Sequence, residues 1–246
     1  MTKPAILYRM ALDTHICPWG LKARHILRAN GYEVDDRLLT TRDEVDAFKA
    51  DQGVMTTPQI WIDGHRIGGH DDLLRHVGKP VRDPNALTYA PVIAIFAMAA
   101  AMGLAASWSI SGALLTVRAF EWFVAFAMCL LALQKLRDVE SFATQFLGYD
   151  LFAQRWVPYA SLYPWLEGLA GVLMIAGALQ WLSIPVALFI GGIGTASVFY
   201  AVYIQKRELK CACVGGNSNV PLGFISLTEN LMMVGMATWM LVKPGM

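Results

Sequence analysis

The four cysteines of this 246-residue chain are the residues best suited to chemistry, and their spacing defines two kinds of site. Cys17 is followed by Pro18, a residue typical of the first position of a helix. A thiol at a helix N-terminus meets unpaired backbone N–H groups and the positive end of the helix dipole, and both stabilise its thiolate. Cys17 is therefore the candidate nucleophile.

A second thiol site is the pair Cys211 and Cys213, separated by one residue near the end of a long apolar region. A disulfide between such near neighbours closes a very short loop, so it is strained and exchanges readily. Four cysteines are too few for a disulfide scaffold. The two sites together indicate thiol-disulfide exchange.

The composition predicts a membrane protein, because 56% of the residues are apolar and only 16% are charged. Residues 84–117 and 168–205 contain no Asp, Glu, Lys or Arg. A bilayer core of about 30 Å requires roughly 20 apolar residues in a helix, so each uncharged run is long enough to cross it. The net charge of +1 gives no sign of a nucleic-acid partner, and none is expected.

The first third of the chain differs, because residues 1–83 are rich in charge and contain all five histidines. Its apolar periodicity and its Gly, Asn and Asp positions predict the element order βαβαββα. Thr41 and Glu44 have the spacing of a capping box that opens the second helix. The expected strands are 5–10, 32–39, 59–62 and 66–67, and the expected helices start at 17–18, 41 and 71 and end near 30, 53 and 77.

Three motifs in this part of the chain, over residues 4–79, resemble glutaredoxin: Cys17-Pro18-Trp19-Gly20, Thr57-Pro58-Gln59 and Gly68-Gly69-His70-Asp71-Asp72. The resemblance implies an α/β thioredoxin-like fold and glutathione as co-substrate. It implies that Pro58 is a cis proline facing Cys17 and that the backbone of Thr57 pairs with the cysteinyl group of glutathione. The remaining residues that it assigns to glutathione are Trp19, Gly69, His70 and Asp71, the last three at the γ-glutamyl end.

Two departures from the glutaredoxin pattern affect the mechanism. Gly20 stands where a dithiol site has its second cysteine, so Cys17 must be resolved by glutathione or by another thiol. The stretch between Tyr8 and Cys17 is longer than usual in the family. The basic residue that normally precedes the active site is therefore not assigned between Arg9 and His15.

Beyond a linker over residues 80–88, rich in proline and charge, the sequence predicts five membrane spans. The segment Leu182-Ser183-Ile184-Pro185 is expected to divide the longest apolar run into two helices. The expected spans are 89–107, 114–134, 157–180, 184–205 and 222–242.

The distribution of basic residues predicts the orientation of these spans. With a cytosolic N-terminus, the inner loops contain Lys135, Arg137 and Arg155 and then Lys206, Arg207 and Lys210, whereas Arg118 lies at an outer end. No signal peptide is expected, because the first apolar stretch, 5–8, is too short. We expect a multi-pass protein of the plasma (inner) membrane, with a cytosolic glutaredoxin-like domain and with both thiol sites on that side.

Three residues of different spans, Cys129, Glu167 and Glu229, are expected at a similar depth, about six to ten residues from the cytosolic ends of their helices. Ionisable groups at that depth are costly and indicate a functional site that faces the bundle interior. The alternative is that the two carboxyls are protonated and hydrogen-bond between helices. Cys129 alone is also compatible with simple packing. Arg118 and Glu121 are expected to pair near the outer surface.

From Arg118 onward the chain resembles the MauE/DoxX group of small membrane proteins. The resemblance rests on Lys135-Leu136-Arg137-Asp138 closing a span, Pro164-Trp165-Leu166-Glu167-Gly168 opening the next, and Cys211-Ala212-Cys213 before the last. It implies a four-helix core and thiol redox activity, or support of disulfide formation in partners. The expected domains are a glutaredoxin-like domain, 1–79; a linker, 80–88; a connecting span, 89–113; and a MauE/DoxX-like membrane domain, 114–246.

These observations predict a glutathione-coupled membrane thiol-disulfide oxidoreductase in which Cys17 exchanges with Cys211 and Cys213. Glutathione, membrane lipid and a disulfide of a protein or small molecule are the expected partners, and no metal is expected. Two alternatives remain. Cys211, Cys213 and Cys129 could bind Cu(I) or Hg(II), since thiolates prefer soft metals, or the single thiol of Cys17 could hold an iron–sulfur cluster with glutathione.

Overall fold

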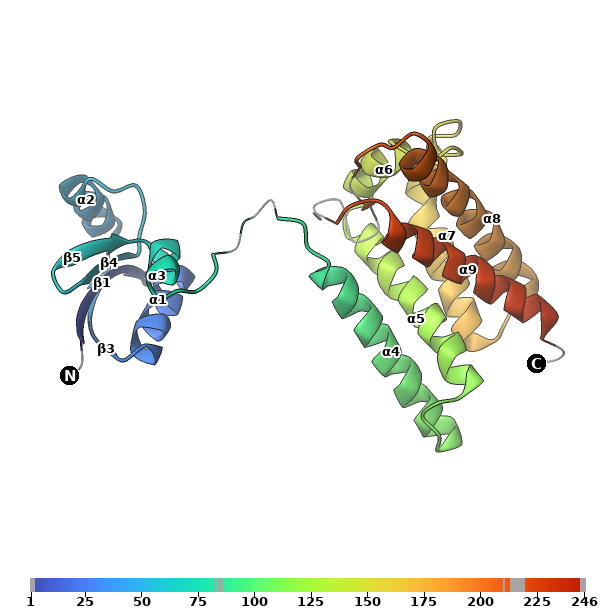
Figure 1. The fold of residues 1–246 in the computed structure, drawn as a ribbon, viewed down its shortest axis with the longest axis horizontal. Helices are drawn as coiled ribbons and strands as arrows, with labels where there is room; N and C mark the ends of the chain where they lie inside the picture. The colour runs from blue at the N-terminus through green and yellow to red at the C-terminus, as the bar shows by residue number, and fades with distance from the viewer. Residues whose placement is uncertain (1–2, 82, 84–85, 210, 213–219, 244–246) are drawn as a thin grey trace. The chain divides into compact units, whose positions relative to one another are not determined.

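The structure is a computed structural model that describes residues 3–81, 83, 86–209, 211–212 and 220–243. It divides into two compact units, Met1–Pro84 and Asn85–Met246. Figure 1 shows a small unit built on a sheet and a second unit built from long helices. The sheet unit contains β1 (Lys3–Leu12), β2 (His15–Ile16), α1 (Pro18–Ala29), β3 (Tyr32–Leu39), α2 (Arg42–Gln52), β4 (Gln59–Ile62), β5 (His65–Gly68) and α3 (His70–His76). The helical unit contains α4 (Ala90–Ser111), α5 (Val117–Leu136), α6 (Val139–Leu147), α7 (Pro158–Ala176), α8 (Gln180–Phe199), the π-helical turn η1 (Tyr200–Ile204) and α9 (Phe224–Val242).

The sheet is built around β1, which pairs in parallel with β3 and antiparallel with β4. β5 adds antiparallel to β4 as a hairpin, and the two-residue strand β2 folds back on the end of β1. Parallel pairing of β1 with β3 requires a crossover, which α1 supplies. The predicted order βαβαββα is therefore present, with β2 as an addition that its two residues were too short to reveal.

The two faces of the sheet are covered by different helices because successive side chains of a strand point to opposite faces. Ala5 and Leu7 of β1 belong to the buried core that includes residues of α1 and α3. Tyr8 points to the other face, where its ring stacks on Phe48 of α2 at 4.6 Å and meets Trp61 of β4 edge-on at 5.4 Å. β1 thus lies between two packed layers, and its C-terminal end leads directly to Cys17.

The predicted cap of α2 is present in full. Thr41 Oγ1 accepts a hydrogen bond from the backbone N of Glu44 at 3.2 Å, and a Glu44 carboxylate oxygen accepts from the backbone N of Thr41 at 3.2 Å. These bonds and those from Thr40 lower the pKa of Glu44. Gly53 ends the helix in the left-handed conformation, with φ 60°.

In the helical unit, α5 packs against α4 and α7, and α8 packs against α7 and α9 (Figure 1). α5 and α7 are antiparallel. Lys135 near the end of α5 contacts Glu167, whereas Cys129, earlier in α5, lies next to Gly171, later in α7. The buried core of the unit draws on these helices and on α6. The five long helices therefore form one bundle around a shared interior.

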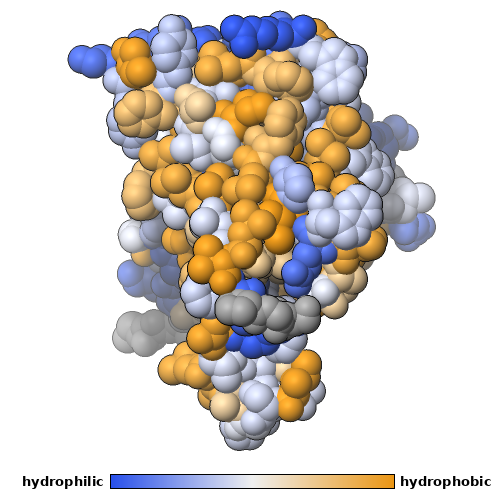
Figure 2. Space-filling view, turned by 90° about the vertical axis from the view of Figure 1, so that its right-hand side faces the viewer, coloured by the Kyte–Doolittle hydropathy of each residue, from blue (hydrophilic) through white to orange (hydrophobic). Residues whose placement is uncertain are grey.

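Four helices within the described residues are long and apolar enough to cross a membrane: α4, α5, α8 continued by η1, and α9. Figure 2 shows apolar side chains over much of the face of the helical unit turned to the viewer. The large apolar residues exposed on the helical unit include Leu115, Trp181 and Phe224. Apolar surface of this extent is what a lipid environment covers.

The sequence predicted five spans, and the difference lies in α7. Its 19 residues extend about 28 Å at 1.5 Å per residue, close to the thickness of a bilayer core. Two prolines and the polar Tyr159, Tyr163 and Glu167 lower its mean hydropathy, and these three side chains are buried inside the bundle. α7 thus presents polar groups to its neighbours, and its composition alone does not mark it as a span.

Two further features differ from the sequence-based prediction. The break between α7 and α8 lies at Gly177 and Leu179, both with positive φ, whereas Pro185 lies inside α8. Pro185 is the sixth residue of α8, beyond the first turn, so it removes the hydrogen bond that a backbone N–H there would donate to Trp181, yet the helix continues through it. The short helix α6 was not predicted; its N-cap Asp138 accepts a hydrogen bond from Ser141 N at 3.0 Å.

Candidate functional site

Cys17 is held at the N-terminus of α1 by the strand that precedes it. Its backbone N donates to the carbonyl oxygen of Met10 at 3.1 Å, and its own carbonyl accepts from Leu21 N at 3.2 Å. Pro18 occupies the first turn, and that turn contains no acidic residue. The side chain is 5% exposed. The thiol therefore lies at the positive end of a helix dipole, with no carboxylate in that turn to oppose a thiolate.

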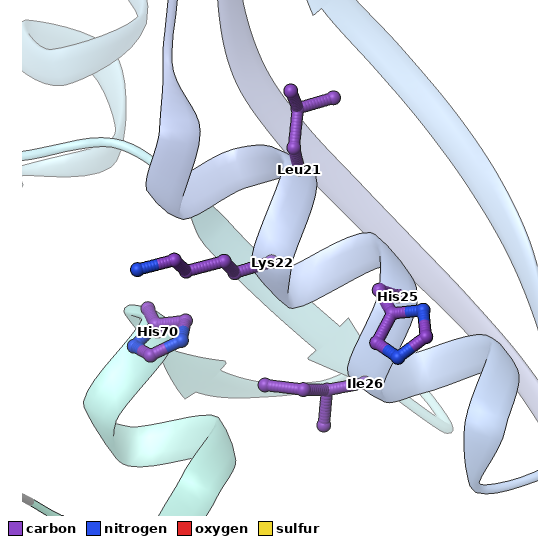
Figure 3. Close-up of a pocket in the computed structure, with 5 residues that line it drawn as sticks. All are labelled: Leu21, Lys22, His25, Ile26 and His70. Carbon is purple, nitrogen blue, oxygen red and sulfur yellow. The ribbon is translucent and has the colours of Figure 1, made fainter. Parts of the chain in front are cut away.

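The side chains next to Cys17 bring α1 and α3 together. The ring of Trp19 lies 5.0 Å from the ring of His70, and the Lys22 ammonium lies 4.4 Å from the Trp19 ring. Figure 3 shows Lys22 extending from α1 towards His70 at the start of α3. A pocket of about 350 Å³ continues along this side, lined by Leu21, Lys22, His25, Ile26 and His70.

The predicted glutathione residues of the other two motifs also lie close to one another. The Thr57–Pro58 peptide bond is cis, as the resemblance implied. A Cβ atom built on Gly69 would lie 3.7 Å from the carbonyl oxygen of Pro58, so the two segments are neighbours. Asp71 is exposed and accepts from His70 Nδ1 at 2.9 Å, whereas Asp72 caps Gly69 N at 3.0 Å.

The side chain of Arg9 leaves no space for a second thiol at position 20. A Cβ atom at Gly20 would lie 2.7 Å from Cβ and 2.9 Å from Cδ of Arg9, which passes beneath it. Arg9 is buried and makes two hydrogen bonds to Asp36, at 2.8 and 2.9 Å. Arg9 is therefore committed to β3, and its side chain occupies the space that a second cysteine would need.

Asp36 completes this support beneath α1. It accepts a third hydrogen bond from Arg24 of α1, at 3.0 Å. Burial opposes ionisation of Asp36, but the hydrogen bonds and charges of Arg9 and Arg24 outweigh it and lower the pKa of the carboxyl. Asp36 thus ties β1, β3 and α1 together.

In the helical unit, Cys211 is fully buried in the connection between η1 and α9. Its backbone N donates to the carbonyl of Val220 at 2.8 Å, and Leu222 N donates to the carbonyl of Leu209 at 2.7 Å. These two bonds pair residues 209 and 211 with residues 222 and 220, respectively. The predicted partner thiol, Cys213, lies outside the described residues. The Cys211 sulfur lies 3.0 Å from Ser226 Oγ of α9.

The two carboxyls predicted at similar depth do meet, and Lys135 joins them. The Lys135 ammonium lies 2.8 and 2.7 Å from the two carboxylate oxygens of Glu167 and 2.6 Å from Glu229 Oε1. All three side chains are almost completely buried. We call these three residues the carboxyl cluster. It connects α5, α7 and α9, and Glu229 Oε2 has no hydrogen-bond partner within the described residues.

Polar side chains lie between the carboxyl cluster and Cys211. Tyr163 is 5.2 Å from Lys135 Nζ, measured to the ring centre, and its hydroxyl donates to Asn230 Oδ1 at 3.4 Å. Asn230 Nδ2 donates in turn to the carbonyl of Ser226 at 2.7 Å. Ser226, Glu229 and Asn230 recur at helical spacing, so they lie on one face of α9. A buried polar face therefore leads from the thiol to the carboxyl cluster.

Cys129, the third residue predicted at this depth, packs against glycines of α7. Its sulfur lies 4.0 Å from the carbonyl oxygen of Gly168, and a Cβ atom on Gly171 would lie 2.8 Å from that sulfur. Within the described residues, no hydrogen bond joins Cys129 to Glu167 or Glu229. The small residues of α7 leave space for the Cys129 side chain, so helix packing alone explains its contacts with Gly168 and Gly171.

A second buried carboxylate marks the opposite end of α5. Glu121 Oε1 accepts from Trp239 Nε1 at 2.8 Å and from Lys243 at 2.7 Å, both of which belong to the C-terminal end of α9. The predicted pair with Arg118 is present, at 3.2 Å. Glu121 thus has partners for both of its oxygens, unlike Glu229.

Comparison with known families matches residues 113–243, more than half of the 246-residue chain, to the methylamine utilisation protein MauE. Residues 6–67 match glutaredoxin. A glutaredoxin of Pseudomonas aeruginosa is 33% identical over 79 residues, which cover 31% of this chain and 89% of that protein. The chain belongs to the MauE family and carries a glutaredoxin domain.

A glutaredoxin domain joined to a MauE domain with apolar helices makes this chain a membrane redox protein. The glutaredoxin domain is a thiol oxidoreductase module, and the matched region contains Cys17, Trp19 and Thr57. The MauE domain contains Cys129, the carboxyl cluster and the Cys211 site. Both families predicted from the motifs are thus confirmed.

Several residues of the MauE domain escaped the sequence analysis. Lys135 was interpreted as a loop cation because it stands at the end of a span, yet its side chain turns into the bundle. Two intramembrane carboxyls without an assigned cation were the signal that could have identified it. Ser226, Asn230 and Tyr163 carry ordinary polar side chains, and only their packing shows that they share the space between Cys211 and Lys135.

Among the described residues, no group of three or more His, Cys, Asp or Glu side chains is placed to hold a metal ion. Cys213, which the soft-metal alternative requires, lies outside those residues.

Proposed function

We propose that this protein is a glutathione-coupled membrane thiol-disulfide oxidoreductase in which Cys17 of the glutaredoxin domain exchanges with Cys211 and Cys213 of the MauE domain. The position of Cys17 carries the proposal: it is the N-cap of α1, followed by Pro18, with no acidic residue in the first turn. A thiol at the start of a helix lies next to unpaired backbone N–H groups and is placed to act as the nucleophile of exchange.

The reaction balances with glutathione as the reductant. The Cys17 thiolate attacks a Cys211–Cys213 disulfide at Cys213, forms a Cys17–Cys213 disulfide and releases the Cys211 thiolate. A glutathione thiolate then attacks Cys17 and releases Cys213, and a second glutathione removes the first as glutathione disulfide. Two glutathiones are oxidised and one protein disulfide is reduced. Attack on Cys213 follows from the complete burial of Cys211.

The absence of a second thiol in the Cys17 turn supports this order of steps. Gly20 cannot be replaced by a larger residue without displacing Arg9, whose guanidinium binds Asp36. A dithiol site would resolve its own mixed disulfide, whereas a single thiol depends on glutathione or on a thiol elsewhere in the protein. The Cys211 site offers that second position within the same chain.

We place glutathione in the region where three segments meet: Trp19 of the Cys17 turn, the Thr57–Pro58 bond, and residues 69–71. The proximity of Trp19 to His70, and of Gly69 to Pro58, supports this assignment. Asp71 is exposed and has the charge needed to receive the glutathione α-amine. Lys22, which lies over Trp19, adds a cation that an anionic tripeptide would meet.

We also propose that the glutaredoxin domain is cytosolic and that α7 crosses the membrane as a fifth span. Arg137, Arg155, Lys206 and Arg207 belong to the connections on the side of the Cys211 site, and an excess of basic residues marks the cytosolic side. A cytosolic glutathione pool is strongly reducing, which favours reduction of the Cys211 site.

The test is peptide mass spectrometry of the purified full-length protein. The protein is incubated with glutathione disulfide and then with glutathione, alkylated, and digested. We expect a Cys17 peptide linked by a disulfide to the peptide containing Cys211 and Cys213. We also expect glutathione to reduce that pair in the wild type and not in Cys17→Ser. Cys129→Ser is the matched control and should leave both results unchanged.

Two results would contradict the proposal. The first is glutathione uptake by Cys17 while Cys211 and Cys213 keep their redox state under all glutathione ratios. The second is reduction of the pair by glutathione at the same rate in Cys17→Ser and in the wild type, since the two domains would then be chemically independent.

A further inference from the structure

The exposed large apolar side chains of the glutaredoxin domain gather at one edge of its sheet. The parallel strands β1 and β3 both end at this edge, and α1 begins there, because Cys17 N donates to the carbonyl of Met10. β4 begins there as well, since Gln59 pairs with Tyr8 of β1. Within the described part of the domain, the exposed large apolar residues are Ile16, Trp19, Leu21, Leu38 and Met55. We call these residues the apolar rim.

The members of the apolar rim come from different parts of the chain. Ile16 and Trp19 precede and follow Cys17, and Leu38 lies near the C-terminal end of β3. Met55 lies in the loop that leads to β4 and is 89% exposed. Among the described residues, the opposite edge, where β3 begins, carries no exposed large apolar side chain. Apolar surface confined to one edge indicates a docking surface.

A cationic pocket lies beside the apolar rim and shares Leu21 with it. It is the pocket of about 350 Å³ that is lined by Leu21, Lys22, His25, Ile26 and His70. Figure 3 shows the side chains of Lys22 and Ile26 directed towards His70. One ammonium and two imidazoles provide hydrogen-bond donors for a phosphate, and Leu21 and Ile26 add apolar surface next to them. This combination fits the head group and first methylenes of a phospholipid.

Helix α1, which forms one wall of the cationic pocket, contains no acidic residue. Its exposed basic side chains Lys22, His25 and Arg28 are spaced three residues apart, so they occupy adjoining positions on the helix surface. Asp71 bonds to Nδ1 of His70 at 2.9 Å and therefore offsets charge at the α3 wall of the pocket, not along α1. The outer face of α1 is thus complementary to an anionic surface.

The chain keeps this domain within reach of a membrane. α3 ends at His76, and α4, a candidate membrane span, begins at Ala90. Residues 77–89, which join them, extend about 45 Å at most. That reach exceeds the radius of gyration of about 12 Å expected for a domain of this size, so the tether permits any face of the domain to turn to the bilayer. Lipid head groups are therefore always present around the domain at high effective concentration.

We propose that the apolar rim and the cationic pocket dock the glutaredoxin domain on anionic phospholipids at the membrane surface. The head-group phosphate enters the cationic pocket between Lys22, His25 and His70, while the apolar rim enters the interfacial layer of the bilayer. Basic residues next to Trp, Leu and Ile side chains are typical of protein surfaces that lie in this layer. The proposal does not depend on exchange between Cys17 and Cys211.

Docking of this kind is weak and reversible. Asp13, between β1 and β2, and Asp43, in the first turn of α2, are exposed and oppose tight binding to an anionic surface, whereas the tether compensates for low affinity. While docked, the domain turns Cys17 to the bilayer surface and away from bulk solvent. Disulfides held in the membrane are then favoured over soluble disulfides as the class of substrate that Cys17 meets.

The first experiment maps the lipid contacts of the full-length protein in nanodiscs. One set of discs contains only phosphatidylcholine, and the other also contains phosphatidylglycerol. Each set includes a trace of its own lipid with a photoreactive diazirine next to the head group. After illumination, lipid adducts are located by peptide mass spectrometry. We expect adducts at residues 16–21 and 53–57 in the discs with phosphatidylglycerol, and none at residues 31–33, where β3 begins at the opposite edge.

Charge variants test the cationic pocket and the basic face of α1. Arg28→Gln should lower the adduct yield at the apolar rim about fivefold, the factor that one basic residue contributes near an anionic membrane. His25→Glu places a carboxylate at the cationic pocket and should abolish the adducts. Lys3→Gln is the matched control: it removes an exposed cation from the opposite edge, where Lys3 pairs with Tyr32, and should leave the yield unchanged.

Apolar variants test the rim. Met55→Ser should lower the adduct yield about tenfold, because it removes most of the apolar area that this side chain would bury in the interfacial layer. Met55→Leu keeps that area and should retain the wild-type yield. Met55 is almost fully exposed, so neither change should disturb the fold.

The second experiment measures how fast an uncharged, water-soluble maleimide alkylates Cys17 in the same discs. We expect alkylation to be about fivefold slower in the discs with phosphatidylglycerol than in those without, because docking turns Cys17 away from bulk solvent. This difference should vanish in Met55→Ser and in His25→Glu and persist in Lys3→Gln.

Different results would overturn the proposal. Adducts as frequent at residues 31–33 as at the apolar rim would show contact without a preferred orientation. Equal yields with and without phosphatidylglycerol, or equal losses in Arg28→Gln and Lys3→Gln, would exclude the cationic pocket as a head-group site. Crosslinks between two copies of the chain through Met55, without lipid adducts there, would assign the apolar rim to a protein partner. Neither measurement requires Cys211 to react, so failure of the proposed thiol exchange would leave this test intact.

Discussion

A Cβ atom on Gly20 would lie 2.7 Å from Cβ of Arg9, a separation that van der Waals contact does not allow. The clash is with the rigid base of the arginine side chain, and the tip of that side chain is bound to Asp36. The absence of a side chain at position 20 is therefore part of how the glutaredoxin domain of this protein packs.

The first prediction concerns the attempt to create a dithiol site. Gly20→Cys should lower the stability of the protein by about 1 kcal/mol, because overpacking costs about 1–3 kcal/mol and a better helix former returns up to about 1 kcal/mol. Gly20→Ala adds the same Cβ without a thiol and should show a somewhat smaller loss, because alanine is a better helix former than cysteine. Thermal unfolding of the two variants provides the check, and a stable Gly20→Ala would disprove the steric explanation.

The second prediction concerns the pH dependence of stability. The pKa of Asp36 is lower in the folded state, so its ionised form stabilises the fold above the pKa of the unfolded chain, about 4. This contribution is lost as the pH falls from there through the folded pKa. Asp36→Asn should cost about 3 kcal/mol at pH 7, because it leaves Arg9 buried without its carboxylate.

Unfolding of the wild type and Asp36→Asn at a series of pH values would measure this difference. It should shrink as the pH falls below about 4. Asp35→Asn is the control: its pair with Arg37 is exposed, so it should change stability by less than about 1 kcal/mol. A difference that stays constant down to strongly acidic pH would contradict the assignment.

The third prediction separates two adjacent aspartates of α3. Asp71→Ala should weaken binding of glutathione about tenfold or more and leave the fold intact, because Asp71 is exposed and its carboxylate is assigned to the glutathione amine. Asp72→Ala should instead cost about 1 kcal/mol of stability, because Asp72 caps Gly69 N. Kinetics with a glutathione mixed disulfide and thermal unfolding would distinguish these effects; equal KM values in the wild type and Asp71→Ala would exclude the assigned role.

The fourth prediction compares two cations at the same end of α5. Lys135→Met should destabilise the MauE domain by about 3–5 kcal/mol, since it leaves two buried carboxyls without a counter-charge. Arg137→Met removes the same charge from a residue that bonds only to Gln134 among the contacts described, and it should have little effect. Unfolding in detergent would measure both, and similar stability of the two variants would argue against the carboxyl cluster as a structural unit.

The fifth prediction concerns the packing of α8 on α9. Gly194→Ala should displace the side chain of Asn230, which a new Cβ would contact closely, and thereby disturb the polar face next to Ser226. Gly192→Ala, two residues earlier, meets no atom within 4 Å and is the matched control. Slower reduction of Cys211 in Gly194→Ala alone is the expected result, and equal rates would remove Asn230 from the supporting structure.

Local sequence determined most of the glutaredoxin domain, because its signals act between near neighbours. The Thr41–Glu44 capping box and the apolar periodicity of β3 each depend on a few adjacent residues, and the structure shows the elements they predicted. The Cys17-Pro18 start of α1 and the cis Thr57–Pro58 bond likewise appear where the motifs indicated.

The environment of the charged groups depended instead on residues far apart in the chain. Lys135 and Glu229 are separated by 94 positions, and Arg9 and Asp36 by 27. A lysine at the end of an apolar run has the same sequence signature whether it faces solvent or turns into the bundle. Only the packing of α5, α7 and α9 removes water from around it, and the cost of burying its charge alone then requires that the two carboxyls lie within hydrogen-bonding distance.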